Sequence, residues 1–84
     1  MDLDREANNV QTREDLARFL NLLLEDLKDP RGAWENPTLD SYLEALAEVV
    51  NGLDARFANL GMNLPDQPTW LLMADMLLAA KTYE

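Results

Sequence analysis

Apolar residues recur at helical spacing in three long stretches of the chain. In the first stretch these residues are Leu16, Phe19, Leu20, Leu23 and Leu27. Steps of three and four residues place them on one side of an α-helix. The pattern predicts a helix over about Arg13–Lys28. Thr12 is its expected N-cap, and Pro30 forces the chain out of helical geometry just beyond its end.

The second stretch has the longest apolar stripe. Its members are Leu39, Leu43, Leu46, Val50, Leu53, Phe57 and Leu60. We expect this stripe to face the core, with Asn36 or Thr38 as the N-cap and Gly61 just past the end. Gly52 falls inside the stripe and costs about 1 kcal/mol relative to alanine. The stripe favours one continuous helix, and the alternative is a break into two shorter helices near Gly52.

The third stretch, "TWLLMADMLLAAKTYE", closes the sequence at residues 69–84. Between Trp70 and Ala80 every residue except Asp75 is apolar or alanine. A helix that is apolar all round is a buried one. We therefore expect a helix over about residues 67–82, capped by Asp66 or Thr69, that packs against both others and keeps Trp70 in the core.

Asp75 allows three interpretations. It lies on a narrow solvent-facing strip, or it is buried and forms a polar clasp with an arginine such as Arg56 or with a loop N–H, or it belongs to a functional site. The first two are favoured over the third, because buried ion pairs mostly specify structure and an unpaired buried charge is expelled or neutralised.

The predicted fold class is all-α. No stretch alternates like a β-strand, and three helices with short connections indicate a small antiparallel three-helix bundle, or four helices if the second breaks. Residues 1–11 are polar and mixed, so we expect an irregular or disordered N-terminus, followed by a single helical domain over residues 12–84. With 48% hydrophobic residues in 84, the chain supports one small core.

Composition limits the chemistry. The sequence has no cysteine and no histidine, which excludes disulfides, thiolate nucleophiles and imidazole acid–base catalysis. No glycine-rich phosphate loop or metal-ligand motif is present. We therefore expect no enzyme activity and no catalytic, cofactor or metal site. No apolar run reaches the length of a membrane span and no signal-peptide pattern opens the sequence, so the expected location is the cytoplasm.

Charge points to proteins as partners. A net charge of −9 repels nucleic acid and suits a basic protein, although it also serves solubility. Asp40, Glu44 and Glu48 follow one another at steps of four, which destabilises a helix without an evident structural gain. Acidic residues also oppose the dipole at the end of the first helix. The candidate partner-binding residues are Asp40, Glu44, Glu48, Glu25, Asp26 and Trp34.

Trp34 has two interpretations. We expect it to fold back over the helix ends, with its N–H bonded to a carbonyl or carboxylate oxygen. If it is exposed instead, it is a candidate anchor for a partner.

The segments "AWENPTLDSYLEAL" and "PTWLLMADMLLAAKTYE" resemble a family of small bacterial proteins of unknown function. The matching residues are Trp34, Glu35, Asn36, Leu43, Glu44, Ala45, Trp70, Ala74, Asp75, Ala79, Ala80, Tyr83 and Glu84. The sequence departs from the family pattern at Val49 and Gly52. The resemblance covers most of residues 13–84 and implies an all-helical domain without a known activity. It slightly favours functional roles for Glu44 and Asp75.

The resulting hypothesis is a non-enzymatic, acidic protein-interaction module. It would bind a basic protein in the manner of an immunity protein that neutralises a nuclease, an analogy of size, charge and helix content only. The alternative is a self-associating domain, with the third helix at a homodimer interface.

Overall fold

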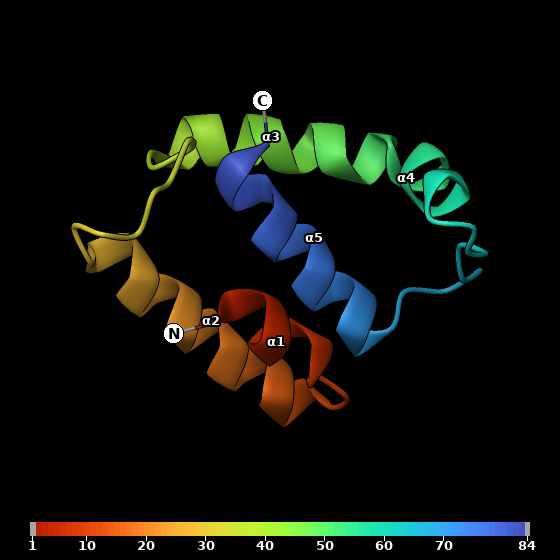
Figure 1. Cartoon of the computed structure of the whole chain (residues 1–84), viewed down its shortest axis with the longest axis horizontal. Helices are drawn as coiled ribbons and strands as arrows, with labels where there is room; N and C mark the ends of the chain where they lie inside the picture. Colours follow the sequence, from red (N-terminus) through yellow and green to blue (C-terminus); the bar gives the residue numbers. More distant parts are fainter. Residues whose placement is uncertain (1, 84) are drawn as a thin grey trace.

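The computed structural model describes residues 2–83 and contains five helices within them. These are α1 (Leu3–Asn8), α2 (Arg13–Lys28), α3 (Leu39–Asn51), α4 (Leu53–Asn59) and α5 (Trp70–Thr82). Helix α5 runs through the middle, with α3 along one side and α1 and α2 along the other (Figure 1). The all-α prediction is confirmed. The predicted three-helix bundle is not observed. Two short helices, α1 and α4, are present besides the three long ones, and among the described residues α2 and α3 do not pack against each other.

Each of the three long helices begins after a threonine N-cap. Thr12, Thr38 and Thr69 are the N-caps, and each side chain accepts a hydrogen bond from the backbone N–H three residues later. These bonds satisfy donors that the first turn leaves free. The bounds of α2 match the predicted ones. The caps of α3 and α5 are Thr38 and Thr69 rather than Asn36 and Asp66, so α5 begins three residues after the predicted start.

The N-terminal segment is not irregular as expected, because it forms α1. Asp2 caps this helix by accepting a hydrogen bond from the Arg5 backbone N–H at 3.1 Å. Leu3, Ala7 and Val10 are buried, and their spacing places them on one side of the helix. This small apolar face packs against α2 and α5. The burial of Leu3, Ala7 and Val10 therefore explains why this mostly polar segment is ordered.

The helix expected to continue through Gly52 is interrupted there. Gly52 ends α3 and precedes α4, so the alternative of two shorter helices is confirmed and continuity was wrong. Helical hydrogen bonds still flank it: its N–H donates to the Glu48 carbonyl and its own carbonyl accepts from Arg56 N, both at 3.0 Å. Gly61 follows α4 with φ of +68°, the left-handed conformation that glycine adopts without strain.

The face of α3 that meets α5 differs from the predicted one. Ala45 and Val49 are buried, whereas Leu39, Leu43 and Val50 are 74%, 53% and 49% exposed. The Tyr42 hydroxyl fixes this rotation by donating a 2.7 Å hydrogen bond to the Leu77 carbonyl of α5, and the small Ala45 side chain permits close approach. The predicted apolar stripe thus lies on the outside of the molecule over α3.

Two hydrophobic clusters meet at α5. The larger is formed by α1, α2 and α5 around Phe19 and Ala74, and the smaller joins Val49 and Leu53 to Leu72 of α5. Ala74 and Ala80 are fully buried, so small side chains on α5 bring the neighbouring helices close. Trp70 does not lie in the core as predicted. It is 41% exposed, because it occupies the first turn of α5 after an exposed connection.

Candidate functional site

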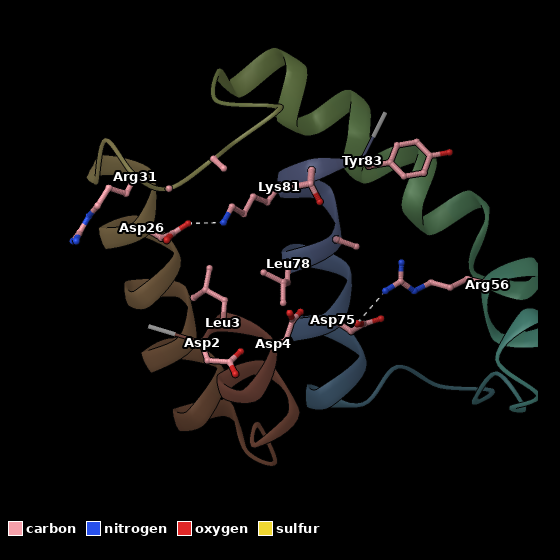
Figure 2. A pocket seen from close by; sticks show the side chains of 14 residues that line it. Asp2, Leu3, Asp4, Asp26, Arg31, Arg56, Asp75, Leu78, Lys81 and Tyr83 are labelled. Atoms are coloured by element: carbon pink, nitrogen blue, oxygen red, sulfur yellow. Dashed lines mark hydrogen bonds and ion pairs between the residues drawn. The ribbon is translucent and has the colours of Figure 1, made fainter.

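Asp26 of α2 is the centre of a partly buried polar clasp. Its Oδ2 accepts a 2.8 Å hydrogen bond from the Trp34 indole Nε1 and lies 2.8 Å from the Lys81 ammonium of α5. Figure 2 shows Asp26 and Lys81 facing each other between the two helices. The Asp26 and Lys81 side chains are 16% and 15% exposed. Lys81 also lies 5.7 Å from the centre of the Trp34 ring, within cation–π range.

These contacts stabilise the ionised carboxylate. The hydrogen bond from Lys81 lowers the pKa of Asp26 below its ordinary value; partial burial opposes this shift, and the Trp34 N–H adds to it. Trp34 thus lies as expected, folded over helix ends with its N–H on a carboxylate. Asp26 and Trp34, both candidate partner-binding residues, join α2, the following loop and α5.

The two residues after Trp34 bind the end of α5. The backbone N–H groups of Glu35 and Asn36 both donate to the Lys81 carbonyl at 3.1 Å. The Asn36 side-chain amide donates to the carbonyls of Ala80 at 3.1 Å and Tyr83 at 2.7 Å. The last carbonyls of a helix lack partners within the helix. Residues 34–36 therefore act as a tertiary cap for α5, and Glu84, the last residue of the family-like pattern, lies outside the described residues.

Asp75 forms a partly exposed ion pair with Arg56 of α4. The guanidinium Nη2 and the carboxylate Oδ1 are 3.3 Å apart, and the side chains are 43% and 41% exposed. Figure 2 shows Arg56 reaching across to Asp75 on α5. Arg56 was one of the arginines expected as a partner, but the pair is not buried. Asp75 thus lies at the solvent-facing side of α5 and also forms an ion pair, which combines two of the three interpretations. The pair contributes about 0–1 kcal/mol to the free energy of unfolding, as exposed ion pairs do.

Both ion pairs border one open cleft of about 740 Å³. Asp2, the N-cap of α1, and Asp4 within α1 also line this cleft, beside Leu3 and Leu78 (Figure 2). In this cleft, Lys81 of α5 pairs with Asp26 of α2, and Asp75 of α5 pairs with Arg56 of α4. The two ion pairs that border the cleft therefore connect α5 to two other helices.

The acidic residues of α3 are all on the surface. Asp40, Glu44 and Glu48 are exposed, as expected for residues at steps of four on one helix side. Asp40 accepts a 2.6 Å hydrogen bond from the Thr38 hydroxyl, which is the main cause that lowers the pKa of Asp40. Glu44 and Glu48 line a shallow hollow beside Asn36 and Tyr83. This acidic face of α3, defined as Asp40, Glu44 and Glu48, is one candidate binding surface.

The structure divides the six candidate partner-binding residues among three places. Asp40, Glu44 and Glu48 form the acidic face of α3, whereas Asp26 and Trp34 belong to the clasp. Glu25 is exposed on α2. Glu25 lies on a helix that does not pack against α3 within residues 2–83, so it is not part of the acidic face of α3.

A second surface, which the sequence analysis missed, is apolar. A groove of about 310 Å³ runs between the second half of α2 and the start of α3. Its lining residues are Leu20, Leu23, Leu24, Leu27, Trp34, Asn36, Pro37, Thr38, Leu39 and Tyr42. We call this the α2–α3 groove. The signal for it was the number of leucines in α2 and α3, which exceeds what one buried side of each helix can accommodate.

Residues 2–83 contain no group of three or more acidic side chains arranged to hold a metal ion. Within the same range, none of the helices has both the length and the apolar character needed to cross a lipid bilayer.

Comparison with known proteins adds the family. The model of a family of unknown function, DUF7660, matches residues 12–84. The chain belongs to this family. The match includes α2 to α5, the clasp and the α2–α3 groove, and leaves α1 outside. No curated protein and no solved structure matches the chain.

Proposed function

We propose that the protein is a non-enzymatic protein-interaction module that binds a basic protein through α3. One observation carries this proposal: α3 turns an apolar stripe, Leu39, Leu43 and Val50, to the outside while it also bears the acidic face. Exposed apolar surface that continues over neighbouring elements marks interaction sites more often than chance exposure does. Its position beside carboxylates favours a partner that has both apolar and basic side chains.

The charge of the whole molecule supports a basic partner. At a net charge of −9, the chain attracts basic proteins over several ångströms and repels acidic ones. Glu44 and Glu48 have no basic residue opposite them among the ion pairs of the described residues. Neutralisation of a basic protein in the cytoplasm, as an immunity protein does for a nuclease, is the biological role that we propose for this binding.

Self-association is the second candidate function. The exposed leucines of α2 and α3 favour a homodimer interface at these helices rather than at α5, where the sequence predicted it. Helix α5 packs against α1, α2 and α3, and its large exposed apolar residues are Trp70 and Leu71 near its start, with Tyr83 just past its end. The exposed leucines of α2 and α3 border one groove, so they support a dimer interface there rather than along α5. Light scattering that gives a monomer at every accessible concentration would remove this candidate.

Affinity capture tests the main proposal. The tagged protein and its Glu44→Lys/Glu48→Lys variant are incubated with lysate of the source organism at low and at high salt, and retained proteins are identified by mass spectrometry. We expect a basic protein that the unmodified chain retains at low salt and releases at high salt, and that the variant fails to retain. Equal retention by both forms, or recovery of nothing but the chain itself, would overturn the acidic-face proposal.

A further inference from the structure

The α2–α3 groove has a preformed aromatic floor. The rings of Trp34 and Tyr42 lie 5.9 Å apart in a tilted arrangement. Trp34 is held by its hydrogen bond to Asp26, and the Tyr42 hydroxyl is held by the Leu77 carbonyl. Side chains fixed in this way lose little freedom when a ligand binds, so the groove needs little rearrangement to accept one.

Leucines form both walls of the groove. Leu20, Leu24 and Leu27 of α2 are exposed at steps of four and three residues, and Leu39 continues the wall on α3. Beyond Leu39, the exposed Leu43 and Val50 extend the apolar surface along α3 into a flatter hollow. A groove between two helices with apolar walls suits an amphipathic helix, which inserts residues spaced three and four apart.

The charge beside the groove selects between possible occupants. On the α3 side, Asp40 adjoins Leu39, and Glu48 lines the hollow that continues the groove. On the α2 side, Lys28 and Glu25 are both exposed, so this side has no excess of either sign. A second copy would bring another net charge of −9 against the first. A helix with a basic edge would instead place that edge against the carboxylates of α3.

We propose that the α2–α3 groove is the docking site for an amphipathic, basic α-helix of the partner protein. Its apolar side lies on Trp34 and Tyr42 between the leucine walls, and its basic edge faces Asp40 and Glu48. This inference rests on the proposed function, because the same acidic face is used. It adds the form in which the partner is recognised.

A synthetic peptide tests the docking site. The probe is a peptide of about 18 residues, five helical turns, made of leucine and lysine so that leucines occupy one side. The control is a peptide of the same composition in an order that forms no apolar side. We expect the amphipathic peptide to bind about tenfold or more tightly than the control, and its amide shift changes in NMR spectra to lie in α2 and at the start of α3.

Matched variants separate the groove from the charge. Leu24→Ser and Leu39→Ser remove exposed leucines of the two walls, and we expect each to weaken binding of the amphipathic peptide about tenfold. Leu60→Ser removes an equally exposed leucine outside the groove and should leave binding unchanged. Because all three positions are exposed, loss of folding does not obscure the comparison.

The failures of the two proposals look different. Equal binding of both peptides, or insensitivity to Leu24→Ser and Leu39→Ser, would overturn the groove while leaving salt-dependent binding to the acidic face intact. Binding that requires the leucines but is unaffected by Glu44→Gln/Glu48→Gln and by salt would overturn the basic partner. A groove that is occupied by a second copy, seen as a dimer that Leu39→Ser dissociates and that the peptide does not displace, would overturn the docking of a partner helix.

Discussion

The indole N–H of Trp34 donates a 2.8 Å hydrogen bond to the Asp26 carboxylate, eight residues earlier in the chain. This bond turns the loop after α2 back over the helix and brings Trp34 under Lys81 of α5. A loop tryptophan thereby packs against the hydrophobic core and forms part of the floor of the α2–α3 groove. The clasp and the α2–α3 groove share the Trp34 side chain. A change that breaks the clasp therefore also changes the floor of the groove.

Replacing Trp34 by phenylalanine tests the clasp. Trp34→Phe keeps an aromatic ring but removes the donor to a partly buried carboxylate, so the free energy of unfolding should fall by about 1–3 kcal/mol. Urea denaturation followed by circular dichroism measures the change. Trp70→Phe is the matched control, because Trp70 is 41% exposed and lies outside the core clusters, and it should change stability by less than about 0.5 kcal/mol. Similar losses in both variants would contradict the role of the indole N–H.

Acid should weaken the clasp. Because the pKa of Asp26 is lower in the folded protein than in the unfolded chain, its stabilising effect is complete above the unfolded value of about 3.9. That effect is lost as the pH falls through the lower folded-state pKa. We expect Asp26→Asn to lower stability at neutral pH and to flatten the acid side of a plot of unfolding free energy against pH.

The control for this measurement is Glu25→Gln, a substitution of the exposed neighbour on the same helix. Asp15, Asp29 and Asp40 also have lowered pKa values, so the Asp26→Asn curve should keep part of its slope. Curves for the wild type and Asp26→Asn that run parallel down to about pH 2 would show that Asp26 is not stabilised as an ion in the folded state.

Gly32 is required for the loop to pass close to α2. A Cβ atom at this position would lie 2.1 Å from the Asp26 backbone oxygen, well inside van der Waals contact. Gly32→Ala should therefore displace the loop and lower the free energy of unfolding by about 1–3 kcal/mol, measured by urea denaturation.

Gly52→Ala is the matched glycine control. A Cβ there would lie 3.4 Å from the Glu48 carbonyl oxygen, at the edge of ordinary contact, and the backbone has negative φ. We expect this variant to be neutral or to gain about 0.4–1 kcal/mol through reduced freedom of the unfolded chain. If Gly52→Ala is the more harmful of the two, the close approach at Gly32 is wrong.

The rotation of α3 and the interruption at Gly52 predict opposite results at two leucines of the same sequence stripe, Leu39 of α3 and Leu53 of α4. Leu53→Ala empties a buried site and should lower the free energy of unfolding by about 2–5 kcal/mol. Leu39→Ala removes a side chain that is 74% exposed and should change it by less than about 0.5 kcal/mol. Denaturant titrations of both variants measure this difference. A large loss at Leu39 would mean that the predicted stripe, rather than the observed face, is buried.

Local signals predicted most of the helices. A threonine cap and a proline bracket α2, and Gly61 ends α4 in the left-handed conformation that the sequence led us to expect. The orientation of α3 could not be obtained in this way, because Leu39, Leu43 and Leu46 satisfy helical spacing as well as Tyr42, Ala45 and Val49 do. The choice depends on a tertiary hydrogen bond, from Tyr42 to Leu77, which periodicity does not encode.

The candidate site was predicted only in part. Trp34 was expected to bond a carbonyl or carboxylate oxygen, but nothing local to the sequence identified Asp26. Lys81 lies far away along the chain, and it meets Asp26 only when α5 is in place. The acidic face of α3 followed from steps of four within one helix. The groove did not, since it requires knowledge of which leucines remain outside the core after α2 and α3 have packed separately against α5.

The central place of α5 has a consequence for how the molecule opens. The cluster around Phe19 and the cluster around Val49 both include residues of α5, so each loses part of its core when this helix detaches. The backbone amides of α5 should therefore exchange hydrogen with solvent only through global unfolding. A cavity made on one side lowers protection on the other, and the domain behaves as one cooperative unit rather than as two independently melting halves.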